Sequence, residues 1–303
     1  MPLSLDYTSV HTTLKNDVEL VSALHLNGVG DDFPSSTYLD HVFRYTCSVI
    51  ATITLTHMTI LTILRSTAKI LDIDKAKINQ IAYQATNLTV NLVLGLYGIY
   101  HYTFTVPHMS TIPTTERITG FDQYVNFACL QIGYNIWSIP VGLFHVGEST
   151  TMLLHHVATI CVSTMSTFSI FGFRYHQPFF FGLVEISSVP LAIMNYCKDN
   201  KQWAQTNIPT VATLARPIFA VMFLTSRVIM WTPNIYDILR NCFILLFTGP
   251  ENLSYRVGMS VFITAILFLT SLQYYWGLLV LRGVIRLVAQ VQFKKVKEVK
   301  KVE

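Results

Sequence analysis

Residues 152–171 read MLLHHVATICVSTMSTFSIF, an apolar segment with two adjacent histidines, His155 and His156, and no Asp, Glu, Lys or Arg. Its length matches the roughly 20 residues that a helix needs to cross the hydrocarbon core of a membrane. Ionisable groups at that depth are costly and are usually retained for a function or a polar partner. The segment therefore predicts a membrane-spanning helix that carries polar chemistry.

The composition of the whole chain agrees with this interpretation. Hydrophobic residues make up 51% of the 303 residues, charged residues make up 13%, and the mean hydropathy is +0.44. A soluble domain has about a quarter charged residues. The apolar segments are long enough for helices and too long for barrel strands. We predict an all-α, polytopic membrane helix bundle of about seven transmembrane helices, at residues 43–64, 83–104, 124–145, 152–171, 178–194, 211–231 and 259–281.

The basic residues are distributed unevenly among the loops. Lys and Arg gather after the first span, after the fifth span and in the C-terminal tail, and are sparse in the alternate loops. Because basic loops stay on the cytosolic side, the N-terminus is predicted to be luminal and the C-terminus cytosolic. The predicted parts are a polar luminal tail (1–41), an extra transmembrane helix with its cytosolic loop (42–79), a six-helix membrane domain (80–290) and a basic cytosolic tail (291–303).

Two short signals favour the endoplasmic reticulum membrane. The chain ends in Lys300-Lys301-Val302-Glu303, which fits the dilysine retrieval signal that coat proteins read on cytosolic tails. Such a signal is an address and adds no membrane affinity. Asn252 begins a glycosylation sequon in a loop that this topology places in the lumen. The alternative is that a lysine-rich tail places two lysines there by chance.

The apolar run at residues 242–247 is too short to cross a membrane, and Thr-Gly-Pro follows it. Gly and Pro end helices. Two interpretations of residues 240–250 stay open: a re-entrant or interfacial segment, and a hydrophobic loop packed on the bundle.

The two histidines point in different directions, because successive helical residues are about 100° apart. One is expected to face the bundle interior and the other an adjacent helix or the interface. A neutral imidazole can take a proton from a hydroxyl or amine nucleophile, as a general base does in acyl transfer; it can also bridge helices by hydrogen bonds. No metal site is predicted, because the adjacent rings diverge and no third ligand is indicated.

A second ionisable group, Glu185, lies in the fifth predicted span. A charged carboxylate there costs about 2.5 kcal/mol or more, so we expect it to be protonated, paired or wetted by a cavity. Arg227 of the sixth span is its predicted partner, either as a link between helices or as part of a site. Tyr134 and Asn135 of the third span belong to a polar stripe, which predicts a wet interior.

At these residues the chain resembles the TLC-domain family, which joins ceramide synthases, translocating-chain-associating membrane proteins and small lipid-homeostasis proteins. The family's His-His element is matched by His155-His156, and its Glu-(Ile/Leu)-Ser-Thr-Pro element is similar to Glu185-Ile-Ser-Ser-Val-Pro190. Its Gly-Tyr and Leu-Asn-x-x-Trp elements resemble Gln131-Ile-Gly-Tyr134-Asn-Ile-Trp137 and Leu272-Gln273-Tyr-Tyr-Trp276. The resemblance covers about residues 80–290.

One departure from the family pattern bears on function. Ceramide synthases follow the histidines with a His-Asp…Asp cluster, whereas this chain has Arg174-Tyr-His176-Gln and then Glu185, without an Asp pair. The chain therefore looks nearer the small lipid-homeostasis proteins. That resemblance implies an influence on the acyl composition of lipids in the endoplasmic reticulum or a related membrane.

Three functions follow as hypotheses. In the first, an acyltransferase, acyl-CoA is the co-substrate and no cofactor is expected; His155 or His156 is the base, Glu185 supports it, and the lipid site includes Tyr134, Asn135, Arg227 and Trp276. In the second, a non-catalytic lipid-binding regulator uses the same polar cavity. In the third, a cargo or assembly factor meets coat proteins through Lys300 and Lys301. Membrane lipids are partners throughout, and nucleic acid is not expected for so apolar a chain.

Overall fold

Ten α-helices form the described part of the chain, which in the computed structural model comprises residues 34–68, 75–169, 171–249 and 253–299. All regular elements within these ranges are helical, so the predicted all-α class is confirmed. The helices are α2 (Ser36–Thr67), α3 (Ile78–Phe104), α4 (Thr114–Thr119), α5 (Val125–Val141), α6 (Thr150–Phe168), α7 (Ser188–Asp199), α8 (Lys201–Asn207), α9 (Pro209–Leu224), α10 (Trp231–Thr248) and α11 (Leu253–Val299). The predicted signals at Asn252, Lys300 and Lys301 lie outside the described residues.

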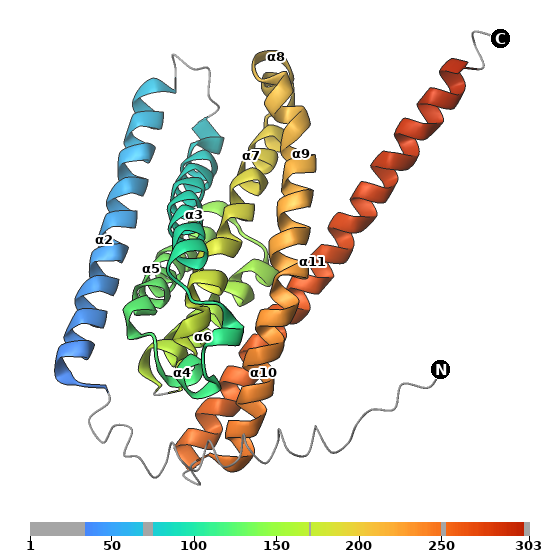
Figure 1. Cartoon of the computed structure of the whole chain (residues 1–303). Coiled ribbons are helices and arrows are strands. Elements are labelled where there is room, and N and C mark those ends of the chain that lie inside the picture. Colours follow the sequence, from blue (N-terminus) through green and yellow to red (C-terminus); the bar gives the residue numbers. More distant parts are fainter. Residues whose placement is uncertain (1–33, 69–74, 170, 250–252, 300–303) are drawn as a thin grey trace, which may run out of the picture.

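The long helices form a bundle from which the C-terminal half of α11 extends away (Figure 1). Among the described residues, five helical stretches are long and apolar enough to cross a membrane: Ser36–Thr67, Thr114–Val146, Arg174–Asp199, Pro209–Phe247 and Leu253–Leu287. The predicted number of about seven is therefore not confirmed. Helices α3 and α6 cover the other two predicted spans, but both carry many polar side chains, which lowers their hydropathy.

Three of the five long stretches contain π-helical turns, at Gly142–Val146, Pro178–Gly182 and Thr225–Ile229. A π-helix at Pro178–Gly182 and a 3-10 helix at Leu183–Ser187 lead into α7, and a π-helix at Thr225–Ile229 joins α9 to α10. Single π-helical turns inside helices occur frequently at functional sites. Here Glu185 lies on the 3-10 helix that directly follows the π-helix at Pro178–Gly182, and Arg227 lies in the π-helix at Thr225–Ile229.

The continuous path from α9 into α10 corrects one of the two interpretations of residues 240–250, the hydrophobic loop. Residues 242–247 are the last turns of α10, which ends at Thr248. They are therefore helix and not loop, while the re-entrant or interfacial interpretation stays a prediction. The physical reason is packing, since Cys242 and Leu245 are fully buried and an apolar face with a core to join favours helix continuation.

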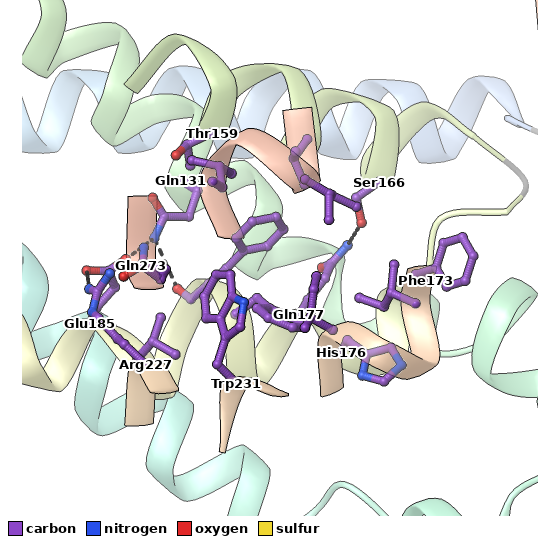
Figure 2. A pocket seen from close by; sticks show the side chains of 18 of the residues that line it. Gln131, Thr159, Ser166, Phe173, His176, Gln177, Glu185, Arg227, Trp231 and Gln273 are labelled. Carbon is purple, nitrogen blue, oxygen red and sulfur yellow. Dashed lines mark hydrogen bonds and ion pairs between the residues drawn. The ribbon is translucent and has the colours of Figure 1, made fainter. Parts of the chain in front are cut away.

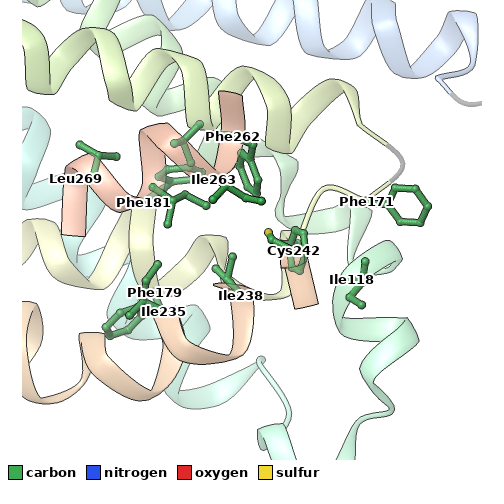
Figure 3. Close-up of a cluster of buried hydrophobic side chains, with 14 of the residues drawn as sticks. Ile118, Phe171, Phe179, Phe181, Ile235, Ile238, Cys242, Phe262, Ile263 and Leu269 are labelled. Atoms are coloured by element: carbon green, nitrogen blue, oxygen red, sulfur yellow. The ribbon is translucent and has the colours of Figure 1, made fainter. Parts of the chain in front are cut away.

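The main hydrophobic core lies between the π-helix at Pro178–Gly182, α10 and α11. Phe179 and Phe181 meet Ile235 and Ile238 of α10 there, and α11 adds Phe262, Ile263 and Leu269 (Figure 3). This core fixes the relative positions of the elements that carry the polar residues described below.

Helix α3 approaches the irregular segment at residues 178–187 through glycine. A Cβ atom on Gly98 would overlap the backbone of Gly182 and Leu183. We expect Gly98→Ala to lower the apparent unfolding temperature of the detergent-purified protein clearly, because overpacking of a tight contact costs about 1–3 kcal/mol. Gly283→Ala is the matched control, since no heavy atom lies within 4 Å of a Cβ there. Equal unfolding temperatures for the two variants would contradict this close contact.

Candidate functional site

His156 is held by a polar network where α6 packs on α5. Its Nδ1 lies 2.6 Å from Oδ1 of Asn135, while Nδ2 of Asn135 donates to the backbone oxygen and to Oε1 of Gln131, at 2.7 and 3.1 Å. Because the Asn135 amide already donates to Gln131, its Oδ1 must accept a proton from Nδ1–H of His156. A neutral His156 therefore carries its lone pair on Nε2.

The Nε2 atom of His156 faces a hydroxyl and a carboxylate. Ser138 Oγ lies 3.3 Å from it and Glu148 Oε2 lies 3.4 Å from it. Tyr83 completes the group, with its hydroxyl 2.6 Å from Ser138 Oγ and 3.0 Å from Glu148 Oε2. These four side chains can pass one proton among a phenol, a hydroxyl, a carboxylate and an imidazole.

His155 points elsewhere. The two adjacent rings are 5.8 Å apart between centroids and inclined at 62°, so the predicted divergence is confirmed. The His155 ring packs edge-on against Trp276, with centroids 5.6 Å apart. Its Nδ1 is buried and has no hydrogen-bond partner among the described residues. His155 is thus the histidine with an open acceptor or donor.

Glu185 and Arg227 form the predicted ion pair, with Nη2 of Arg227 2.9 Å from Oε2 of Glu185. The Arg227 side chain is only 8% exposed and the Glu185 side chain only 15%. Arg227 also donates from Nε to Ser187 Oγ at 2.8 Å and from Nη2 to Ser188 Oγ at 3.0 Å. Gln131 Nε2 donates to the other Glu185 oxygen at 3.3 Å. The buried carboxylate is therefore both paired and hydrogen-bonded, which is the condition for keeping such a charge in an apolar interior.

Two cavities meet at these residues. The first, here the wide cavity, encloses about 1550 Å³ including its mouth, and the second, the narrow cavity, encloses about 670 Å³ by the same measure. Both are lined by Gln131, His155, Glu185 and Arg227. The structure places all of the predicted catalytic and binding residues on the wall of the wide cavity: His155, His156, Glu185, Tyr134, Asn135, Arg227 and Trp276.

Comparison with known proteins identifies the fold family. A family model described as the TLC domain matches residues 77–282. The chain belongs to the TLC-domain family. Its TLC domain contains every residue of the two cavities, whereas α2 lies outside the matched residues. The apolar helices and the TLC domain together identify an integral membrane protein. No curated protein and no solved structure matched the chain.

Sequence reasoning missed part of the candidate site. Glu148 and Tyr83 were not predicted as site residues, although both line the wide cavity. The available signal was position, because Glu148 is the only acidic residue between Asp122 and Glu185 and directly precedes the segment with the histidines. In the part of the chain that the structure describes, no group of three or more His, Cys, Asp or Glu is arranged to hold a metal ion.

A second buried polar cluster, which reaches the wall of the narrow cavity through His176, was also missed. Arg117 binds both carboxylate oxygens of Asp237, from Nη2 at 2.9 Å and from Nε at 3.2 Å. His176 Nε2 lies 3.1 Å from Oδ2 of the same carboxylate. The sequence placed Arg117 in a loop, and its pairing with an acidic residue 120 positions later depends on tertiary structure.

Proposed function

We propose that this protein is a lipid acyltransferase of the endoplasmic reticulum membrane, nearer the small lipid-homeostasis TLC-domain proteins than the ceramide synthases. It transfers an acyl chain from acyl-CoA to a lipid or amine acceptor and so influences the acyl composition of membrane lipids. The observation that carries the proposal is the position of His155, which lines both cavities and has a buried Nδ1 without a hydrogen-bond partner among the described residues.

The two cavities suit the two parts of an acyl donor. The narrow cavity has an apolar middle that includes Val162, Phe181 and Ile266, and each methylene buried there contributes about 0.8 kcal/mol. The wide cavity has Tyr83, Asn87 and Glu148 on its wall and takes the polar part. A carbonyl between the two would lie beside His155.

The chemistry then follows from the charges at the junction. His155 accepts the proton of the acceptor hydroxyl or amine while that group attacks the thioester carbonyl. The carbon–sulfur bond breaks, and the CoA thiol leaves with a proton from His155. Arg227, fixed by Glu185 and Ser187, supplies positive charge near the oxygen that becomes negative during attack.

The arrangement of the helix ends supports cytosolic access for acyl-CoA. The wide cavity extends to Gln84 and Asn195, near the turn between α7 and α8. The start of α3, this turn and the C-terminal end of α11 lie at the same end of the bundle (Figure 1), and each of these segments is basic. Such a surface attracts the phosphates of CoA, and basic segments favour the cytosolic side.

A non-catalytic lipid-binding role is the second candidate. It is favoured by the hydrogen bonding of His156 to Asn135 and by the pairing of Glu185 with Arg227, because satisfied polar groups also serve as links between helices. In this case the same cavities hold a lipid without transferring it.

An assay of the purified protein separates the two candidates. Detergent-solubilised protein is incubated with radiolabelled acyl-CoA and a panel of lysophospholipids, long-chain bases and simple amines, and the products are resolved by chromatography. We expect label in one acceptor class. If every acceptor stays unlabelled while lipid co-purifies with the protein, the acyltransferase proposal is wrong and the lipid-binding role is favoured.

A further inference from the structure

The narrow cavity is polar at both of its ends. Helix α6 contributes His155, Thr159, Val162 and Ser166 to its wall, one residue per turn. At a rise of 1.5 Å per residue, the eleven steps from His155 to Ser166 span about 16 Å. Glu185, Arg227 and Gln273 lie at the His155 end, and Ser166, Gln177 and His176 lie at the other end, with Trp231 between them (Figure 2).

The far end presents one open hydrogen-bond acceptor. Gln177 is 1% exposed and donates from Nε2 to Ser166 Oγ at 2.8 Å. Ser166 in turn donates its hydroxyl proton to the backbone oxygen of Gly172 at 2.5 Å. Ser166 can therefore only accept from Gln177, which fixes the orientation of the amide. Oε1 of Gln177 is left buried and without a partner among the described residues.

The neighbouring polar group cannot satisfy this oxygen. Both ring nitrogens of His176 already have partners, Nδ1 with Asn234 Oδ1 at 3.3 Å and Nε2 with Asp237 Oδ2 at 3.1 Å. A buried acceptor without a donor is costly, more so than an apolar group of the same shape. The Oε1 acceptor of Gln177 is thus satisfied only when a donor from outside the chain reaches it.

We propose that the narrow cavity binds an acyl chain of roughly a dozen carbons that carries a hydroxyl group at or near its methyl end, since about 16 Å separates the two polar ends. This proposal rests on the placement of the acyl chain under the proposed function. The hydroxyl proton is donated to Oε1 of Gln177. A second carboxylate does not suit this position, because Gln177 offers an acceptor there and the Arg117 guanidinium is already bound to Asp237.

Ligand binding tests the inference without any requirement for turnover. Dissociation constants are measured by native mass spectrometry of the delipidated, detergent-solubilised protein with dodecanoic acid, 12-hydroxydodecanoic acid and dodecanedioic acid. The readout is the ratio of constants for the hydroxylated and unhydroxylated chains on one protein sample, which does not depend on the folded fraction. Gln177→Leu replaces the acceptor by an apolar group of similar size. Ile238→Val is the matched control, because Ile238 lines the same cavity without a polar atom.

In the wild type we expect the hydroxylated chain to bind more tightly than the diacid. In Gln177→Leu, the affinity for the hydroxylated chain relative to that for the unhydroxylated chain should fall roughly tenfold, which is the effect of losing one buried hydrogen bond. Ile238→Val should leave the ratio unchanged. The same ratio in the wild type and Gln177→Leu would overturn the inference. If dodecanoic acid itself does not bind or compete with acyl-CoA, the chain placement in the proposed function fails as well.

Discussion

Replacing His155 with alanine should lower the rate of acyl transfer by about 10²–10⁴-fold, the contribution of a general base. The reason is geometric, because His155 lines both cavities and has an unpartnered ring nitrogen. The acceptor nucleophile would lose the group that takes its proton, whereas the apolar wall that holds the acyl chain would remain. The measurement is the initial rate with labelled acyl-CoA, together with the amount of lipid bound.

Two other histidines provide the comparison for this variant. His156→Ala should cost far less activity, because His156 is anchored to Asn135 and lines the wide cavity but not the narrow one. His57→Gln should keep the wild-type rate, since His57 hydrogen-bonds Thr86 and lines neither cavity. Full loss in His156→Ala with activity retained in His155→Ala would assign the base to His156 instead.

Arg227→Met should lower the free energy of unfolding by about 3–5 kcal/mol, because it leaves the largely buried Glu185 carboxylate without its charge partner. Unfolding of the purified protein by sodium dodecyl sulfate in mild detergent measures this change. The exposed pair of Arg44 and Asp40 is the control. Its side chains are 78% and 57% exposed, and solvent-exposed ion pairs contribute little, so Arg44→Met should leave stability nearly unchanged.

A double variant separates the pair from the individual residues. Combining Arg227→Met with Glu185→Gln removes both charges and should restore much of the stability that Arg227→Met loses, because residues in contact have non-additive effects. Additive losses would show that Arg227 acts through Ser187 and Ser188 rather than through Glu185.

The sequence was most informative where an ionisable residue interrupted an apolar segment. Glu185 could be matched with Arg227 because an unpaired charge at that depth is costly, and the structure contains the pair. The alternation of apolar and polar segments was sufficient to predict an all-helical bundle. These inferences needed only local sequence and the properties of the bilayer.

Other features depended on packing that no single segment reveals. Glu148 lies outside every predicted span and reaches Tyr83 and His156 only because α3, α5 and α6 pack together. The run at 242–247 was considered apart from the sixth span because its helical continuity with α9, through the π-helix at Thr225–Ile229, depends on packing. Gln177 becomes notable only once the hydrogen bonds of Ser166 are known.

The π-helix at Thr225–Ile229 also sets the rotational phase of everything that follows it. A π-helical turn accommodates one more residue than an α-helical turn, and one residue corresponds to about 100° of rotation. Ile235, Ile238 and Cys242 therefore face the core, while Tyr236 and Phe243 face outward. Deleting one residue from this turn would rotate either Arg227 away from Glu185 or the apolar face of α10 away from the core. The Arg227–Glu185 ion pair and the wall of the narrow cavity therefore both depend on the one extra residue of this π-helical turn.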